Sequence, residues 1–188
     1  MRKTKCEFSN DHKKRVYNCV TDLIGSVDNA TPMIMLNDRI NPAPGFALGV
    51  KLERYNIFGS IKDRVALKMM QNTDIKIDQT VLEASSGNTA LALAAIGNAM
   101  DIPVEVAIPE RAPEEKKQIL RMLGVSELWE AEDALCPLYP NEGARGLAKG
   151  LSESIAYDGK YVYLNQYENA LNVQAHYETT GPEIWNQT

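Results

Sequence analysis

The chain has 188 residues, of which 44% are hydrophobic and 24% charged, the usual proportions of a globular protein that can bury a core. Its 20 basic and 25 acidic residues give a net charge of −5, which argues against a nucleic-acid partner. Apolar runs fall far short of the roughly 20 residues of a membrane span, and the polar N-terminus does not resemble a secretory signal. We therefore expect a soluble protein that acts on small molecules.

The cysteine and histidine pattern offers neither a disulfide framework nor a metal site. Cys6, Cys19 and Cys136 are odd in number and widely spaced, and His12 and His176 are isolated from one another. We expect a reducing, cytoplasmic location and no bound metal.

The predicted elements begin with a weakly patterned stretch and then alternate regularly. Within residues 1–30 only a short helix around residues 15–24 is expected. Two strands, at residues 33–36 and 46–52, are expected to pair across the Asn-Pro-Ala-Pro-Gly turn. From residue 60 onward the pattern predicts helices at 60–71, 89–100, 113–123 and 142–156, and strands at 80–84, 104–108, 125–129 and 161–164. This alternation predicts an α/β fold, a mostly parallel open sheet flanked by helices.

Lys62 lies in the first turn of the helix expected at residues 60–71. Ser60 followed by Asp63 is a loose capping box, which places the helix start at Ser60. A lysine in the first turn faces the positive end of the helix dipole, and this field favours the free amine that attacks a carbonyl carbon. Taken alone, the position suits a surface lysine better. Asp63 and Arg64 are interpreted as helix-start and surface charges.

A second helix start follows the strand expected at residues 80–84, in the Ser-Ser-Gly-Asn-Thr turn of residues 85–89. A strand, a glycine turn and a helix form an anion-binding geometry, because backbone N–H groups point outward at the helix start. The spacing matches neither a Walker loop nor a dinucleotide fingerprint, and ordinary N-capping is the alternative interpretation. Both helix starts are expected at the C-terminal edge of the sheet, where ligands of such folds bind.

Three blocks of sequence together resemble the cysteine synthase and cystathionine β-synthase family of fold-type II pyridoxal-phosphate enzymes. The first block, residues 51–64, ends in Gly-Ser-Ile-Lys-Asp-Arg, and the second is the turn of residues 85–89. The third, residues 165–185, begins with Asn-Gln-Tyr-Glu-Asn and ends with Thr-Thr-Gly-Pro-Glu-Ile-Trp. The resemblance runs from about residue 31 to residue 188.

The resemblance also implies a division of the chain into parts. Residues 1–30 would be an N-terminal extension, and residues 60–164 the small α/β domain. Residues 31–59 and 165–188 would form the first part of the large domain. No Gly-Thr-Gly-Gly run, which holds the cofactor phosphate in the family, occurs in the sequence. We therefore interpret the chain as an incomplete form that lacks the remainder of the large domain and binds the cofactor weakly.

By this resemblance, Lys62 would hold pyridoxal 5′-phosphate as a Schiff base and later move the Cα proton of the substrate. Asn88 would hydrogen-bond the 3′ oxygen of the cofactor. The substrate carboxylate would be bound by Ser85, Ser86, Thr89 and Gln166.

The implied reaction is β-replacement in cysteine biosynthesis, catalysed by a cytoplasmic transferase or lyase that is a homodimer when complete. O-acetylserine or O-phosphoserine would be the amino-acid substrate, and a thiol or sulfide would replace its leaving group. Two other interpretations stay open: a truncated, inactive relative that binds a partner or a small acid, and a serine/threonine dehydratase. Ile61 and Thr89 favour β-replacement over the dehydratase.

Overall fold

The computed structural model of the protein describes residues 16–43, 45–132 and 139–188. The expectations for Cys6, Cys136 and His12 therefore concern residues outside the described ranges.

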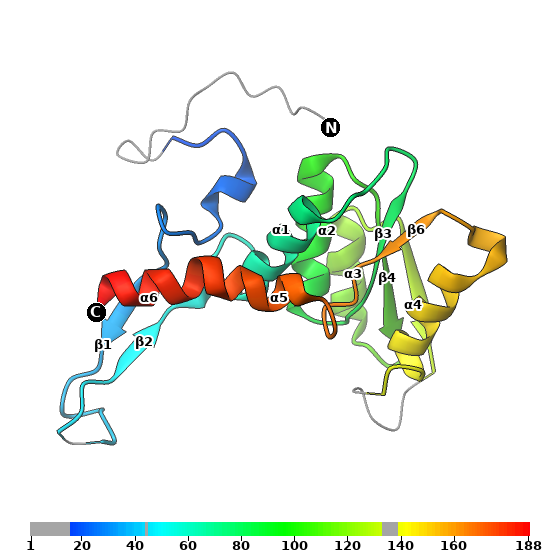
Figure 1. Cartoon of the computed structure of the whole chain (residues 1–188). Coiled ribbons are helices and arrows are strands. Elements are labelled where there is room, and N and C mark those ends of the chain that lie inside the picture. The colour runs from blue at the N-terminus through cyan, green and yellow to red at the C-terminus, as the bar shows by residue number, and fades with distance from the viewer. Residues whose placement is uncertain (1–15, 44, 133–138) are drawn as a thin grey trace.

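A four-stranded parallel sheet forms the centre of the larger lobe (Figure 1). Its order is β5 (Glu127–Ala131), β4 (Val104–Pro109), β3 (Thr80–Ala84) and β6 (Tyr161–Tyr163), and all three pairings are parallel. Every residue of β3 is buried, as expected for a central parallel strand covered on both faces. The predicted α/β class and parallel sheet are confirmed.

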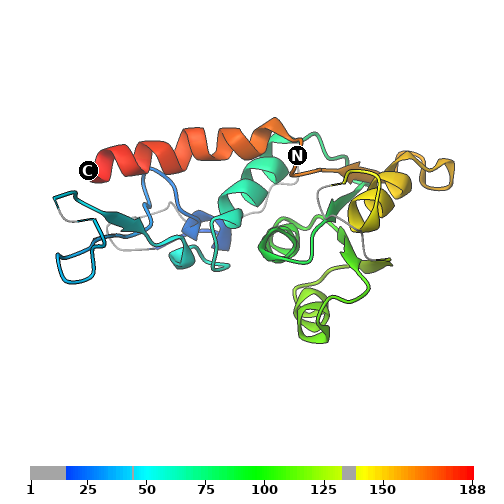
Figure 2. The same cartoon turned by 90° about the horizontal axis from the view of Figure 1, so that it is seen from below.

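Helices cover both faces of this sheet (Figure 2). One face packs against α1 (Lys62–Asn72), α2 (Asn88–Met100) and α3 (Glu114–Met122), and the other against α4 (Gly143–Glu153). The two layers follow from the alternation of side chains along each strand. On β3, for example, Val81 belongs to the first apolar cluster and its neighbour Leu82 to the second.

An antiparallel hairpin projects from the sheet lobe (Figure 1). Its strands are β1 (Met33–Met35) and β2 (Gly49–Lys51), so the predicted pairing is confirmed. The helix expected around residues 15–24 is present only as the 3-10 turn η1 (Val20–Leu23), and a second 3-10 turn, η2 (Glu53–Tyr55), follows β2.

A long C-terminal helix, which the sequence patterns did not predict, runs from the sheet lobe to the hairpin (Figure 1). It consists of α5 (Ala170–Ala175), the π-helical turn η4 (His176–Thr180) and α6 (Gly181–Gln187). Pro182 normally ends a helix because it cannot donate a hydrogen bond. The π turn absorbs this interruption, so the chain stays helical through Gly181 and Pro182.

The end of α4 also differs from the prediction of a helix over residues 142–156. The helix stops at Glu153, and a separate 3-10 turn, η3 (Ile155–Tyr157), follows. Ser154 separates the two with an extended backbone, and its side chain accepts the N–H of Ala156. A serine that bonds its own backbone in this way competes with helix continuation.

Candidate active site

Lys62 is the first residue of α1, as the Gly-Ser-Ile-Lys-Asp-Arg motif suggested, but the helix begins differently from the prediction. The hydroxyl of Ser60 accepts the Lys62 N–H at 3.1 Å. The Asp63 carboxylate accepts the backbone N–H of Phe58 at 2.7 Å and the Ser60 hydroxyl at 3.3 Å. The helix therefore starts at Lys62 rather than Ser60, and Asp63 reaches back to the turn before Ser60 instead of forming a standard capping box.

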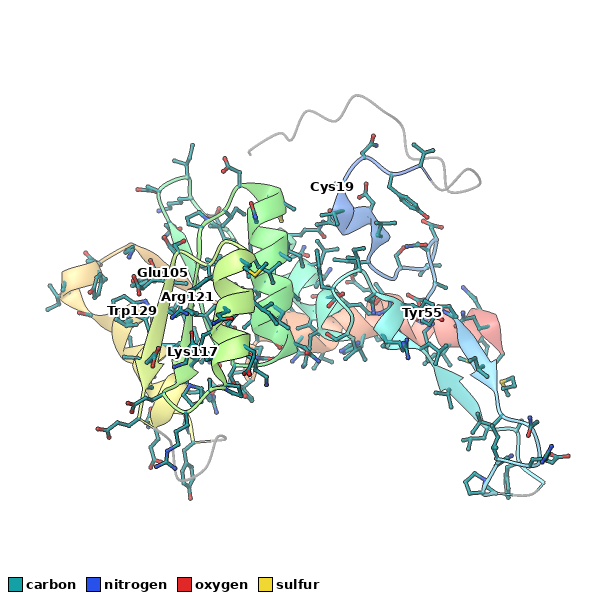
Figure 3. The ribbon with its side chains drawn as sticks, turned by 180° about the vertical axis from the view of Figure 1, so that it is seen from behind. Cys19, Tyr55, Glu105, Lys117, Arg121 and Trp129 are labelled. Atoms are coloured by element: carbon teal, nitrogen blue, oxygen red, sulfur yellow. The ribbon has the colours of Figure 1, made fainter. Side chains whose placement is uncertain are left out.

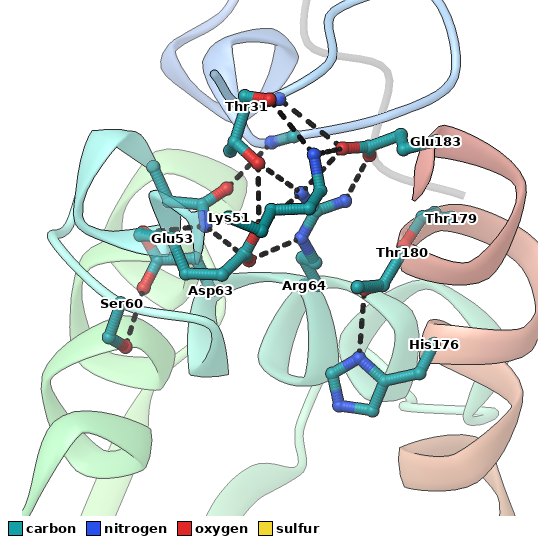
Figure 4. Close-up of polar contacts among 12 residues, drawn as sticks. Thr31, Lys51, Glu53, Ser60, Asp63, Arg64, His176, Thr179, Thr180 and Glu183 are labelled. Carbon is teal, nitrogen blue, oxygen red and sulfur yellow. Dashed lines mark hydrogen bonds and ion pairs between the residues drawn. The ribbon is translucent and has the colours of Figure 1, made fainter. Parts of the chain in front are cut away.

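The interpretation of Asp63 and Arg64 as surface charges was wrong, because both side chains are buried. Arg64 donates from Nε to Glu53 at 2.7 Å, and its other nitrogens bond both carboxylate oxygens of Glu183 (Figure 4). Burial lowers the pKa of Arg64, but the bonds to Glu183 and Glu53 outweigh burial and leave the pKa raised. A buried guanidinium held by two carboxylates is a structural element of the fold.

Lys51 and Thr31 complete this ion network around Glu183 (Figure 4). The Lys51 ammonium lies 2.8 Å from the Glu183 carboxylate and donates to the Thr31 carbonyl at 2.9 Å. The Thr31 hydroxyl donates to Glu53 at 2.7 Å. The network therefore joins the first and third blocks of the family resemblance and fixes α1, with Lys62 at its start, against α6.

The turn of residues 85–89 connects β3 to α2 at the C-terminal edge of the sheet. Gly87 occupies the cap position of α2, and no side chain caps the helix there. The Ser85 hydroxyl accepts the Gly87 N–H at 3.2 Å and so shapes the turn. Ordinary side-chain capping of α2 therefore does not explain the serines of this turn.

Thr89 and Gln166 are brought together by the fold. Thr89 is 3% exposed, and its hydroxyl donates to the Gln166 side-chain oxygen at 2.7 Å. Gln166 is also buried, and the side-chain amide of Asn172 donates to the backbone carbonyl of Gln166 at 2.8 Å. The segment after β6 is thus attached to the start of α2.

Three predicted site residues keep their polar groups available. Within the described ranges, the Lys62 ammonium, the Ser86 hydroxyl and the Asn88 amide make no hydrogen bond or ion pair. Asn88 is exposed, and the other two are half-buried. The amine lies at the start of α1, and the hydroxyl and the amide lie at the start of α2, which packs against α1. Together they offer a nucleophile for a carbonyl compound and hydrogen-bond donors for an anion.

His176, at the start of η4, is electrostatically coupled to Lys62. Burial lowers the pKa of His176, and the charges of Lys62 and Arg64 lower it further. Its Nδ1 lies 3.0 Å from the Thr180 hydroxyl (Figure 4). The sequence showed His176 only as an isolated histidine, because nothing in the local pattern links η4 to the start of α1.

Glu83 is a buried acid that the sequence reasoning missed. It lies on β3 and is 0% exposed, and burial raises its pKa to about 7. Its Oε2 accepts the backbone N–H of Gln166 at 3.2 Å. The signal was present in the sequence as a lone charge in the apolar strand before the turn of residues 85–89.

The residues at the two helix starts could hold part of pyridoxal phosphate. Lys62 offers an amine that has no partner in the described part of the chain and could react with the aldehyde carbon, and Asn88 offers an amide at a helix start. The sequence lacks the Gly-Thr-Gly-Gly run that would hold the phosphate.

Among the described residues there is no group of three or more metal-binding side chains, and none of the helices is long and apolar enough to cross a membrane.

A family model described as "Pyridoxal-phosphate dependent enzyme" matches residues 26–188. The chain belongs to this family. The match includes Lys62, the turn of residues 85–89, Gln166 and the C-terminal helix.

Cysteine synthases are among the relatives that match this chain in sequence. The chain is 43% identical over 142 residues to the cysteine synthase of Aquifex aeolicus, covering 73% of this chain and 41% of that protein. It is 37% identical over 162 residues to cysteine synthase B of Salmonella typhimurium, covering 84% and 50%. The chain spans about half the length of these relatives.

Solved structures agree with the sequence relatives. The cysteine synthase of Entamoeba histolytica matches with a TM-score of 0.76 and 29% identity, over 96% of this chain and 52% of that one. A hydrogen sulfide-producing enzyme of Fusobacterium nucleatum matches with a TM-score of 0.77 and 32% identity, over 92% and 53%. The fold is therefore that of fold-type II pyridoxal-phosphate enzymes over half their length.

Proposed function

We propose that this chain forms the N-terminal part of a pyridoxal-phosphate enzyme that replaces the β-substituent of an activated serine. The observation that carries the proposal is the Thr89–Gln166 hydrogen bond, which unites two of the three motif blocks at one edge of the sheet. The remaining block, residues 51–64, supplies Lys62, whose amine has no competing partner within the described ranges. The cysteine synthase relatives favour O-acetylserine or O-phosphoserine as the amino-acid substrate and a thiol or sulfide as the second substrate.

In this proposal, different residues of the chain would bind the cofactor and the substrate. Lys62 would hold the cofactor through its amine and, once displaced by substrate, move the proton of the substrate Cα. Asn88 would bind the 3′ oxygen of the cofactor. When bound, pyridoxal phosphate supplies an electron sink for the charge left at Cα. The substrate carboxylate would be held by Ser85, Ser86, Thr89 and Gln166.

The domain division follows from the same proposal. Residues 60–164 would be the small domain, and residues 31–59 with 165–188 the start of the large domain, whose remainder would hold the cofactor phosphate. The C-terminal helix supports this division, because Val173, Tyr177 and Trp185 are 73%, 81% and 83% exposed. Apolar side chains repeated on one helix face are usually covered in a complete fold. A homodimer and a cytoplasmic location remain part of the proposal.

Cofactor and substrate titrations test this function. Adding pyridoxal phosphate to the protein should produce the absorbance band of a lysine-bound cofactor, and Lys62→Ala should abolish the band. O-acetyl-L-serine should shift the band, and sulfide should restore it with formation of cysteine. A band of equal strength in Lys62→Ala would refute the assignment of Lys62.

The same titration separates the two alternatives. A dehydratase would release a keto acid from L-serine or L-threonine without any thiol. An inactive binding protein would bind L-serine and show no cofactor band.

A further inference from the structure

Glu83 connects β3 to the segment that follows β6. Its two carboxylate oxygens accept different backbone groups, the Ala84 N–H at 3.0 Å on Oε1 and the Gln166 N–H at 3.2 Å on Oε2. Glu83 and Gln166 are 83 positions apart in the sequence. A side-chain bond between such distant segments fixes the backbone of one relative to the other.

Gln166 is held at three points. Glu83 binds its N–H, Asn172 binds its carbonyl, and Thr89 donates to its side-chain oxygen. Thr89 in turn belongs to the helix that follows β3, so the contacts close a ring that runs from β3 through Gln166 to α2 and back along the chain. Removing one member of such a ring loosens the others.

We propose that Glu83 is a positioning residue, whose carboxylate holds the Gln166 backbone so that the Gln166 amide stays against Thr89. This inference rests on the proposed function for its catalytic meaning, because it keeps both segments of the proposed carboxylate site in register. The geometric link itself requires no cofactor.

The groups around Glu83 make this link sensitive to protonation near neutral pH. Burial raises the pKa of Glu83 to about 7. Hydrogen bonds from the backbone N–H groups of Gln166 and Ala84, a hydrogen bond from the Gln166 side chain and the charge of Arg145 act in the opposite direction. A protonated carboxyl has a hydroxyl in place of one acceptor oxygen, so it binds two N–H groups less well than a carboxylate does. The hold on Gln166 therefore weakens as the pH falls through this range.

Arg145 and Tyr163 are the ionisable neighbours of Glu83 among the described residues. Arg145, on α4, also binds Glu168 at 3.0 Å and lies over the Tyr167 ring at 4.4 Å. Burial, followed by the charge of Glu83, raises the pKa of Tyr163 to about 12. Tyr163 therefore stays neutral across the range in which Glu83 titrates.

Glu105 provides a matched control within the same sheet. It is a buried glutamate on β4, and its carboxylate accepts from Trp129 and Tyr161 at 2.7 Å each and from Lys160 at 2.9 Å. Glu105 and Trp129 lie close together in Figure 3. None of these partners belongs to the turn of residues 85–89 or contacts Gln166, so Glu105→Gln imposes a similar loss of charge without touching the ring.

The test is an NMR titration of the protein without cofactor, between about pH 5 and pH 9. The backbone N–H and the side-chain amide of Gln166 should titrate together with a midpoint of about 7. Glu83→Gln should flatten both curves and speed exchange of the Gln166 N–H by about tenfold, because the glutamine amide can accept only one of the two N–H groups. In Glu105→Gln, the titration curves of the Gln166 backbone N–H and side-chain amide should be unchanged.

Three results would overturn the proposal: a Gln166 signal that does not titrate in the wild-type protein, a backbone signal that titrates without the side-chain amide, or equal effects of the two glutamine variants. The wild-type titration decides even if Glu83→Gln fails to fold. Since no cofactor is present, failure here is distinct from failure of the proposed function, which would appear as loss of cofactor binding at Lys62 with this titration intact.

Discussion

The guanidinium of Arg64 and the carboxylate of Glu183 form an ion pair in which neither side chain is exposed, although 119 positions separate them in the sequence. The pair joins the helix that begins with Lys62 to the helix that ends the chain. The orientation of the proposed cofactor lysine therefore depends on the C-terminal helix.

Breaking this pair should destabilise the protein strongly. Glu183→Gln leaves the buried charges of Arg64 and Lys51 without their shared carboxylate, so we expect the free energy of unfolding to fall by about 3–5 kcal/mol. Urea denaturation followed by circular dichroism measures the change. Glu178→Gln removes an exposed partner of Lys68 and should leave the midpoint nearly unchanged. Equal shifts in the two variants would contradict this account.

The coupling between Lys62 and His176 gives a prediction that needs neither substrate nor cofactor. Replacing Lys62 with methionine removes a positive charge that lowers the pKa of His176, so that pKa should rise. NMR titration of the imidazole signals measures the change. Lys68→Met, in the same helix, should leave the titration unchanged, since Lys68 is paired with Glu178. A His176 pKa that stays constant in Lys62→Met would show that the two side chains are not coupled.

Glu83 should make stability fall as the pH rises. Its pKa is about 7 in the folded protein and near the ordinary glutamate value of 4.5 in the unfolded chain, so between these values the folded state binds more protons. The free energy of unfolding should therefore decrease from pH 4.5 to about pH 7, and Glu83→Gln should remove this contribution. Denaturant titrations at several pH values give the difference between the two proteins.

The wild-type protein has to be compared with Glu83→Gln because other acids change the stability with pH in the opposite direction. The pKa of Glu53 and of Glu105 is lowered, since hydrogen bonds from cationic and neutral partners outweigh the effect of burial. Their stabilisation is lost as the pH falls below the usual glutamate range. If the wild-type and Glu83→Gln proteins show parallel pH dependence above pH 4.5, the raised pKa of Glu83 is wrong.

The Thr89–Gln166 bond should be measurable as a coupling energy. Thr89→Val keeps the shape of the side chain but leaves the Gln166 oxygen without its donor, so we expect a loss of about 1–3 kcal/mol. A double-mutant cycle with Gln166→Leu should give a coupling of about 0.5–3 kcal/mol. Ser85→Val, which disturbs only the turn, should show no coupling to Gln166→Leu. Additive effects of Thr89→Val and Gln166→Leu would contradict the bond.

Much of the fold could be predicted because its signals are local. The β3 boundaries, Thr80 to Ala84, agree with the prediction, since a short apolar run before a glycine turn is a local pattern. The C-terminal helix was missed because Gly181 and Pro182 normally stop a helix, whereas here a π turn, in a helix that contacts α1, precedes them.

The site could be predicted where its functional residues are close together in the sequence. Lys62 and the turn of residues 85–89 stand out in the sequence, and the family resemblance connects them. The burial of Arg64 and the role of Glu83 could not be inferred, because their partners Glu183 and Gln166 are distant in sequence and meet only in the folded protein.

Peptide mapping after borohydride reduction tests the central claim most directly. The protein is incubated with excess pyridoxal phosphate, reduced and digested, and each lysine is examined by mass spectrometry. We predict that the pyridoxyl group is found on Lys62 and that Lys68, six residues later in the same helix, stays unmodified. Modification of another lysine in preference to Lys62, or no modification at all, would contradict the assignment of Lys62 as the cofactor lysine.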